Sequence, residues 1–227
     1  MAIVEVRGLT RTYEQGATMV HALRGIDLDI EPGEFTVLMG PSGSGKTTLL
    51  NQIGALDLPD SGSISIEGRD LAGLSKADLA ELRLQRIGFV FQSYNLIPVL
   101  TAYENAEFVP LLQKVGLAER AERVMSTLAV MGLEGMEDRR PNQLSGGQQQ
   151  RVAVARALAG KPALILADEP TANLDSTTGY ELIATMKKLN EEQGVTFVFA
   201  THDPKVMEHA RRIVRLVDGL IVEDLRK

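Results

Sequence analysis

The sequence predicts an α/β fold with a largely parallel sheet, an antiparallel β layer near the N-terminus and an inserted helical subdomain. Short apolar runs alternate with longer helical patterns, which is typical of strands joined by crossover helices. Segments of alternating apolar and polar residues near the N-terminus indicate strands of a different, antiparallel kind. Between Thr101 and Arg139 the helical pattern is continuous and interrupts this alternation.

The parallel sheet is predicted from four short apolar runs rich in β-branched or aromatic residues, as buried strands are. These runs cover residues 35–40, 87–91, 163–168 and 196–201. Each of the last three runs ends in a polar residue or is directly followed by one. Because ligands of open α/β sheets bind at the carboxyl ends of the strands, we expect the functional side chains there.

The other elements complete one domain. Alternating patterns over 4–13, 26–30 and 62–68 predict the antiparallel layer, and 214–224 predicts a hairpin with a type I′ turn at Asp218 and Gly219. Helices are predicted over 102–115 and 118–133. We therefore expect an α/β core of residues 1–91 and 160–227 that carries a helical subdomain of approximately 92–159.

Composition narrows the class of protein. The chain has 227 residues, a net charge of −6 and no cysteine, so it can bury a full core but has no disulfide or thiolate metal cluster. Lys and Arg are scattered, which disfavours a nucleic-acid partner. No window resembles a membrane span, and the first ten residues lack a signal-peptide pattern. These features predict a cytosolic protein.

The segment GPSGSGKT matches a phosphate-binding loop, G-x-x-x-x-G-K-[ST], between a predicted strand and a predicted helix. Glycines allow backbone N–H groups to surround phosphate oxygens, Lys46 reaches the β- and γ-phosphates, and the Thr47 hydroxyl binds Mg²⁺. The predicted ATP-binding residues of this loop are Gly40, Pro41, Ser42, Gly43, Ser44, Gly45, Lys46, Thr47 and Thr48.

Two carboxylates complete a predicted metal and hydrolysis site. The apolar run ALILADE ends in Asp168 and Glu169. We expect Asp168 to hold the Mg²⁺ shell and Glu169 to point toward a water that attacks the γ-phosphate. An acid pair alone is ambiguous at the end of a strand, and the phosphate-binding loop upstream favours the catalytic interpretation.

A second glycine-containing loop, LSGGQQQR at 144–151, opens a predicted helix with a broad apolar face. Its N-terminus offers backbone donors of the kind that bind phosphate. One nucleotide needs only one such loop, and the first loop already surrounds the β-phosphate. We therefore interpret the second loop as serving a nucleotide held by another chain.

In these motifs the sequence resembles the ATP-binding cassette (ABC) ATPases, the motor subunits of ABC transporters, over nearly its whole length. The motifs occur in the order of the family: GPSGSGKT, Gln92 after a strand, LSGGQ, ILADEP, ANLD at 172–175 and THD at 201–203. The resemblance implies a head-to-tail homodimer around two ATPs. It also implies that Ser145, Gly146, Gly147 and Gln148 of one chain close over the γ-phosphate held by Lys46 of the other.

The resemblance also implies individual roles. Glu169 is expected as the general base, His202 as a contact to the γ-phosphate, Gln92 as a sensor of Mg²⁺ and of the membrane partner, Asp175 at the dimer interface and Tyr13 against adenine. The metal shell is then formed by Thr47, Gln92 and Asp168.

One motif departs from the family. The family commonly has Gly or a Ser-Ala pair before the Leu-Asp of ANLD, where this chain has Ala172 and Asn173. The role of Asn173 therefore stays open.

Spacing narrows the type of ABC ATPase. Ser145 follows Lys46 by only 99 positions, which excludes the long coiled coil of DNA-repair and chromosome ATPases. Translation-factor ABC proteins have two cassettes in a chain, and P-loop kinases and G proteins lack LSGGQ. A transport subunit remains.

The stretch 86–112 resembles the lipoprotein-release and macrolide-export subfamily. This implies a four-span permease with a large extracytoplasmic domain and a peripheral position on the cytoplasmic face of the inner (plasma) membrane. The alternatives are a small-solute importer ATPase and a soluble ATP-dependent regulator. A hydrophobic groove between the helical subdomain and Gln92 would favour a permease, and a uniformly charged surface would favour the regulator.

Overall fold

The structure is a computed structural model that describes residues 1–16 and 18–227. Its larger sheet has six strands in the order β10-β9-β3-β8-β7-β6. Neighbouring strands from β9 to β6 are parallel, and only the edge strand β10 is antiparallel. The strands are β3 (Phe35–Met39), β6 (Ile87–Val90), β7 (Leu164–Asp168), β8 (Thr196–Ala200), β9 (Arg212–Val217) and β10 (Leu220–Arg226).

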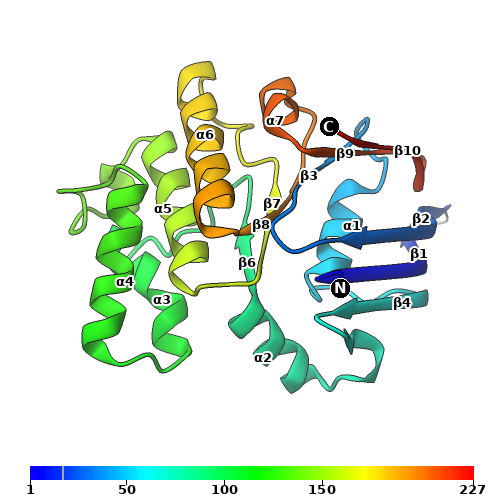
Figure 1. The fold of residues 1–227 in the computed structure, drawn as a ribbon, viewed down its shortest axis with the longest axis horizontal. Helices are drawn as coiled ribbons and strands as arrows, with labels where there is room; N and C mark the ends of the chain where they lie inside the picture. Colours follow the sequence, from blue (N-terminus) through cyan, green and yellow to red (C-terminus); the bar gives the residue numbers. More distant parts are fainter. Residues whose placement is uncertain (17) are drawn as a thin grey trace.

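The smaller sheet is the predicted antiparallel layer, with four strands in the order β2-β1-β4-β5. Its strands are β1 (Val4–Gln15), β2 (Thr18–Ile30), β4 (Ser61–Ile66) and β5 (Arg69–Asp70). Figure 1 shows β1, β2 and β4 side by side, separated from α5 and α6 by the strands of the larger sheet.

Helices cover both sides of the larger sheet. They are α1 (Lys46–Ile53), α2 (Lys76–Arg86), α3 (Ala102–Leu112), α4 (Leu117–Val130), α5 (Gly146–Ala159), α6 (Ser176–Gln193) and α7 (Pro204–His209), with short 3₁₀ turns at Leu71–Gly73 and Pro141–Gln143. Helices α3 and α4 lie beyond α5, far from the small sheet (Figure 1). None of the described helices combines the length and the apolar composition that a membrane span requires.

Strand alternation divides the core into two clusters. Leu164 and Leu166 of β7 face the small sheet, α1 and α2, whereas Ile165 and Ala167 face the cluster shared with α3 to α7. This two-sided burial follows from the period of two in a strand. It also explains why the strands of the larger sheet are nearly continuous apolar runs, the pattern from which they were predicted.

The predicted fold class is confirmed, and most predicted strands have the observed bounds within one or two residues. The strand predicted over 26–30 is longer and begins at Thr18, because its first four residues are all exposed and carry no alternating apolar pattern. Asp218 and Gly219 both have positive φ, 48° and 77°, as the predicted type I′ turn requires. The helix predicted to continue past residue 112 ends at Leu112, where Gln113 caps it. Helices α2, α6 and α7 were not singled out from the sequence.

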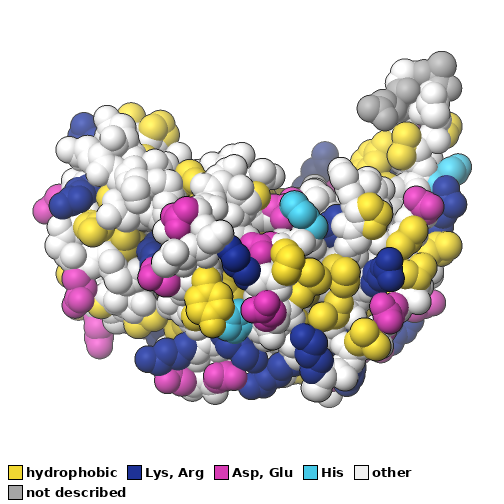
Figure 2. Space-filling model, turned by 90° about the horizontal axis from the view of Figure 1, so that it is seen from above, with side chains coloured by type: hydrophobic (Ala, Val, Ile, Leu, Met, Phe, Trp, Pro, Cys, Tyr) yellow, Lys and Arg dark blue, Asp and Glu magenta, His cyan; other side chains and the backbone are white. Residues whose placement is uncertain are grey.

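The carboxyl ends of the parallel strands lie on one side of the molecule. Helix α7 directly follows β8 and lies at the top of Figure 1, so these strand ends point upward in that view. Figure 2 looks down on this side and shows a hollow between two raised parts of the surface. The hollow is therefore where ligands of such a sheet bind.

A buried arginine ties the edge of the larger sheet together. Arg212 of β9 is 5% exposed, and its guanidinium contacts Asp224 of β10 at 2.7 Å and Glu34, just before β3, at 3.0 Å. Its hydrogen bonds hold the pKa of the Asp224 carboxyl below its ordinary value. A carboxylate of this kind stabilises the fold at neutral pH and loses its contribution as the pH falls.

We expect Arg212→Met to lower the free energy of unfolding by roughly 2–4 kcal/mol, because it leaves two carboxylates without their buried partner. Urea denaturation at pH 7 measures this change. Arg211→Met is the matched control, since Arg211 is half-exposed and pairs with Glu191 at 3.3 Å, and it should change stability by less than about 1 kcal/mol. The difference in the free energy of unfolding between the wild type and Arg212→Met should become smaller as the pH falls below about 4. Equal effects of the two variants would contradict this role.

Candidate functional site

A cleft of about 610 Å³ at the strand ends collects most of the predicted site residues. Gln92 follows β6, Glu169 follows β7 and His202 follows β8, so segments far apart in the sequence meet there. Tyr13, Val20 and Ala22 close the side toward the small sheet. The lining residues are Tyr13, Val20, Ala22, Gly40, Pro41, Ser42, Gly43, Ser44, Gly45, Lys46, Thr47, Thr48, Gln92, Glu169 and His202.

The loop between β3 and α1 is shaped to bind an anion. Helix α1 has no side-chain cap, so its first N–H groups are available to a ligand, unlike those of α5 and α6. Gly45 precedes the helix with φ of 99°, and a Cβ there would lie 2.4 Å from the carbonyl oxygen of Ala22. The Oγ atom of Ser44 is buried without a hydrogen-bond partner in the described residues. These features fit bound phosphate oxygens.

Lys46 is held across the loop. Its Nζ atom donates to the carbonyl oxygens of Gly40 at 2.8 Å and Pro41 at 3.0 Å, and the residue is only 8% exposed. The ammonium group has no carboxylate partner among the ion pairs of the described residues. A buried cation held only by carbonyl groups is available to neutralise an anionic ligand.

Thr47 and Asp168 form a pair of oxygen donors beside this loop. The Thr47 Oγ1 atom donates to Asp168 Oδ1 over 3.1 Å. Burial raises the pKa of Asp168, while Thr47 and Lys46 act in the opposite direction. No group of three or more acidic, His or Cys side chains in the described part of the chain forms a metal site by itself. This oxygen pair suits Mg²⁺ that also takes ligands from substrate phosphates, as Mg²⁺ commonly does.

Glu169 is held in an unusual conformation at the end of β7. Its φ of 44° lies in the left-handed region, and its backbone N–H donates to Ala200 at 2.8 Å. One carboxylate oxygen accepts a hydrogen bond from Thr201 at 2.8 Å, and the other lies 2.7 Å from Nδ1 of His202. The carboxylate is thereby aimed into the cleft, as a general base would be. Strain of this kind is characteristic of functional sites.

The two partners of Glu169 differ in burial. Thr201 is fully buried, whereas the His202 side chain is 77% exposed. Thr201 therefore holds one oxygen of Glu169 from within the core, and His202 contacts the other from the open side of the cleft.

Tyr13 lies on β1 at the rim of the cleft, with its hydroxyl bound to Asp57 at 2.7 Å. The guanidinium of Arg11 lies 4.7 Å from the ring centroid. Asp57 and Arg11 fix the ring at this position. One ring face is thus covered by a cation, and the opposite face is the surface that an adenine base could contact.

Gln92 and Asp175 are exposed, and each is held by neighbouring residues. The carbonyl oxygen of Gln92 accepts a hydrogen bond from Asn173 at 2.9 Å, while its side chain faces the cleft. Asp175 caps helix α6 through the N–H groups of Thr177 and Thr178, both at 3.0 Å. The hydrogen bonds from Thr178 lower the pKa of Asp175. Asp175 thus has a local role in addition to the predicted place at an interface.

The predicted site residues outside the lining of the cleft are those of the LSGGQ loop, together with Asp168 and Asp175. Ser145 caps α5: its Oγ atom accepts a hydrogen bond from the N–H of Gln148, and the Oε1 atom of Gln148 accepts one from the N–H of Ser145. Gly147 lies against α6, where a Cβ would be 2.4 Å from Thr178. None of Ser145, Gly146, Gly147 and Gln148 lines the cleft of its own chain.

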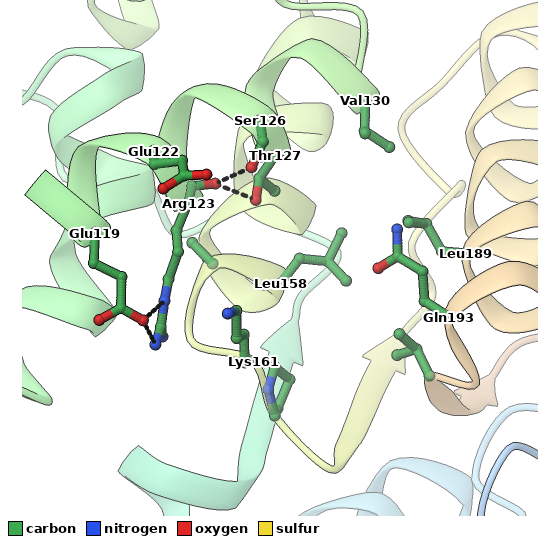
Figure 3. Close-up of a pocket in the computed structure, with 13 residues that line it drawn as sticks. Glu119, Glu122, Arg123, Ser126, Thr127, Val130, Leu158, Lys161, Leu189 and Gln193 are labelled. Carbon is green, nitrogen blue, oxygen red and sulfur yellow. Dashed lines mark hydrogen bonds and ion pairs between the residues drawn. The ribbon is translucent and has the colours of Figure 1, made fainter. Parts of the chain in front are cut away.

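A second cavity of similar size, about 570 Å³, contains none of the predicted site residues. It lies between α4, the end of α5 and α6, and Figure 3 shows Leu158 and Lys161 between these helices. Arg123 in its wall donates to Glu119 of the same helix at 3.0 Å. Arg123 and Glu119 form an ion pair, and the cavity contains no residue of the sequence motifs, so the cleft at the strand ends remains the candidate site.

Comparison with known proteins agrees with this geometry. Residues 23–172 match the sequence profile of the ABC transporter family. The chain belongs to that family. A macrolide export ATP-binding/permease protein of Syntrophobacter fumaroxidans is 48% identical over 97% of this chain, which spans 31% of that relative. The lipoprotein-releasing system ATP-binding protein of Anaeromyxobacter dehalogenans is 48% identical, with 97% of this chain and 93% of that relative covered.

A solved structure has the same fold. The ATP-binding cassette MJ0796, whose sequence comes from Methanocaldococcus jannaschii, was captured as a dimer in a post-hydrolysis state with ADP and phosphate. It superposes with a TM-score of 0.91 at 46% identity and covers 98% of both chains. The predicted family and fold are thus confirmed, and the chain is similar to proteins named for macrolide export and for lipoprotein release.

Three side chains near the site were not assigned a role from the sequence. Thr201 binds Glu169, and Asn173 binds the carbonyl group of Gln92. Gln150 lies between the loop that carries Glu169 and the loop that carries Gln92. The THD motif contains Thr201, so a polar residue at the end of an apolar strand was the available signal. Asn173 was visible only as a departure from the family pattern.

We expect Thr201→Val to lower kcat for ATP hydrolysis roughly 10- to 100-fold, because a hydrogen bond to a charged group contributes about 1.5–3 kcal/mol. Val has nearly the shape of Thr but cannot donate to Glu169. Thr201→Ser keeps the hydroxyl and should stay within about threefold of the wild type. Phosphate release at saturating ATP measures both variants, and equal kcat values for Val and Ser would refute the positioning role of Thr201.

Proposed function

We propose that two copies of this chain enclose two ATP molecules head to tail and hydrolyse them to drive a membrane permease. The observation that supports this most strongly is the separation of the two phosphate-binding loops. The cleft around Lys46 excludes Ser145, Gly146, Gly147 and Gln148, and Ser145 is exposed at the start of α5. A second chain can supply this helix end to the open cleft. The dimeric MJ0796 relative is in keeping with this assembly.

Within each cleft the residues have distinct tasks in binding. The loop 40–48 holds the phosphates through backbone N–H groups, and Lys46 neutralises them. Thr47, Asp168 and Gln92 would hold Mg²⁺, which supplies charge neutralisation on the phosphate oxygens when bound with ATP. The free face of Tyr13 would contact the adenine base.

Hydrolysis then depends on Glu169 and His202. Glu169 accepts a proton from water as the water oxygen bonds to the γ-phosphorus, and the bond from that phosphorus to the β–γ bridging oxygen breaks. ADP and inorganic phosphate are the products. His202 turns from Glu169 to the γ-phosphate and stabilises the charge that develops there. Ser145 of the partner chain would contact the same phosphate.

A permease docking site is supported by a third cavity, of about 470 Å³. It lies between α2, β6, α3 and the end of α5, next to the loop of Gln92. We propose that it separates the core of 1–91 and 160–227 from the helical subdomain of approximately 92–159. The apolar residues that line it are Leu56, Leu84, Ile87, Gly88, Phe89, Phe91, Ile97, Phe108, Val109, Ala157, Gly160 and Pro162.

This groove favours a transport subunit over a soluble regulator, because a uniformly charged surface was the expectation for the regulator. The names of the relatives support a lipoprotein-release or macrolide-export partner. We propose, from the family resemblance of the sequence, that this partner has four spans and a large extracytoplasmic domain. On this proposal the chain is peripheral on the cytoplasmic face of the inner membrane. A small-solute importer remains the second candidate within the transport class.

Glu169→Gln is expected to keep ATP binding and to accumulate an ATP-bound dimer, while hydrolysis falls at least about 100-fold. Size-exclusion chromatography with ATP and a phosphate-release assay measure the two effects. Lys46→Ala provides the contrast, since it should lose tight ATP binding and therefore the dimer. Retained turnover in Glu169→Gln would eliminate the general-base assignment.

Phe108→Glu is expected to weaken permease binding at least about tenfold, because it places a charge in an apolar groove. Tagged Glu169→Gln, with and without Phe108→Glu, is incubated with ATP and detergent-solubilised native membranes, and co-purifying membrane proteins are quantified by mass spectrometry. Leu117→Glu is the control, since Leu117 is 72% exposed on α4 and outside the groove.

A co-purified protein with four spans and a large extracytoplasmic domain would support the lipoprotein-release and macrolide-export type. A many-spanning permease with a solute-binding protein would instead support the importer. Recovery of no membrane protein by any variant would favour the soluble regulator.

A further inference from the structure

Gln150 is a fully buried polar side chain that contacts two functional loops at once. It belongs to α5, five residues after Ser145, and its exposure is 0%. Its amide Nε2 atom donates to the carbonyl oxygen of Pro170 at 2.9 Å and to that of Phe91 at 3.4 Å. Pro170 follows Glu169, and Phe91 precedes Gln92. The amide group therefore lies between the backbone of the general base and that of the predicted metal sensor.

Packing alone does not explain a glutamine here. The Oε1 atom of Gln150 is buried without a hydrogen-bond partner among the described residues. Leaving a polar atom unpaired in the core destabilises a fold, and an unbranched apolar residue such as Met would fill the same space without that cost. What Gln provides and Met does not is the NH₂ group on the two carbonyl oxygens. The orientation of the amide is unambiguous, because both neighbours are acceptors.

The loop around Gln92 is bound mainly to the same helix. Arg156 of α5 donates to the carbonyl oxygens of Tyr94 at 3.0 Å and Asn95 at 2.5 Å. Two consecutive residues of this loop, Tyr94 and Asn95, have positive φ, 59° and 51°. Such a backbone persists only where surrounding contacts hold it. The position of loop 91–95 thus follows the position of α5.

We propose that Gln150 is a positioning residue that transmits the position of α5 to Gln92 and Glu169 of its own chain. This inference rests on the proposed function, in which the start of α5 contacts the ATP of the partner. When Ser145 closes over that ATP, Gln150 moves with the helix and adjusts the two loops of its own cleft. The two ATP sites of the dimer are therefore coupled through a short rigid segment, and hydrolysis at each site depends on closure at the other.

Gln150→Met tests this coupling, with Gln149→Met as the matched control. Gln149 is the preceding residue of α5, and among the described residues its side-chain amide donates only to the carbonyl oxygen of Leu144, just before the same helix, at 3.1 Å. We expect Gln150→Met to lower kcat at least tenfold, to change KM for ATP less than threefold and to bring the Hill coefficient for ATP close to 1. We expect Gln149→Met to keep the wild-type values. A residue that only stabilised the fold would alter the melting temperature without this separation of kcat from KM.

The assay uses the full chain, with thermal melting and ADP binding measured on every variant. If Gln150→Met does not fold, Gln150→Leu replaces it, since it is apolar, adds no volume and has no NH₂ group, and the same loss of kcat is expected. Wild-type kcat and cooperativity in a folded Gln150 variant would overturn the inference, as would an equal loss in Gln149→Met. ATP-dependent dimerisation of Glu169→Gln is followed in parallel. Failure of that dimerisation would contradict the proposed function itself, whereas dimerisation together with an unaffected Gln150→Met would overturn only the role of Gln150.

Discussion

The parallel pairing of β3, β8 and β7 is the constraint on which the site depends. Leu38 pairs with Ala200, and Asp168 pairs with Ala200 from the other side, so the ends of three strands lie in one row. The chain leaves each strand with a different functional residue: Gly40 after β3, Asp168 and Glu169 at β7, Thr201 after β8. A shift of one residue in either register would turn these side chains to the opposite face of the sheet. The hydrogen bonds of the sheet thus determine the geometry of the chemistry.

Local sequence was sufficient to predict features whose physics is local. The phosphate-binding loop needs glycines, a lysine and a hydroxyl at fixed spacing, so Gly40 to Thr47 could be recognised directly. The buried strands were recognisable because both of their faces are covered, which removes polar residues from them. The turn at Asp218 and Gly219 likewise carries its own backbone requirement.

Contacts between distant segments could not be predicted in the same way. Thr201 and Glu169 are separated by 32 positions, and Gln150 and Phe91 by 59. Nothing in the neighbouring residues indicates which carbonyl group a buried amide will reach, because that depends on how a helix packs on the sheet. The sequence also could not separate the two tasks of Gly147, which lies in the LSGGQ loop and also fits against Thr178 of α6. Packing and function select the same residue there.

The capping box at the start of α5 orders the Ser145 side chain before any ligand binds. The Ser145 Oγ atom accepts a hydrogen bond from the N–H of Gln148, which restricts the rotation of the side chain and leaves the hydroxyl proton free. An exposed serine on a flexible loop would lose rotational freedom on binding an anion, and affinity would fall accordingly. Here that entropy is already lost during folding. On the proposed function, the helix end would meet a phosphate as an already ordered donor, so little of the binding free energy would be spent on ordering it.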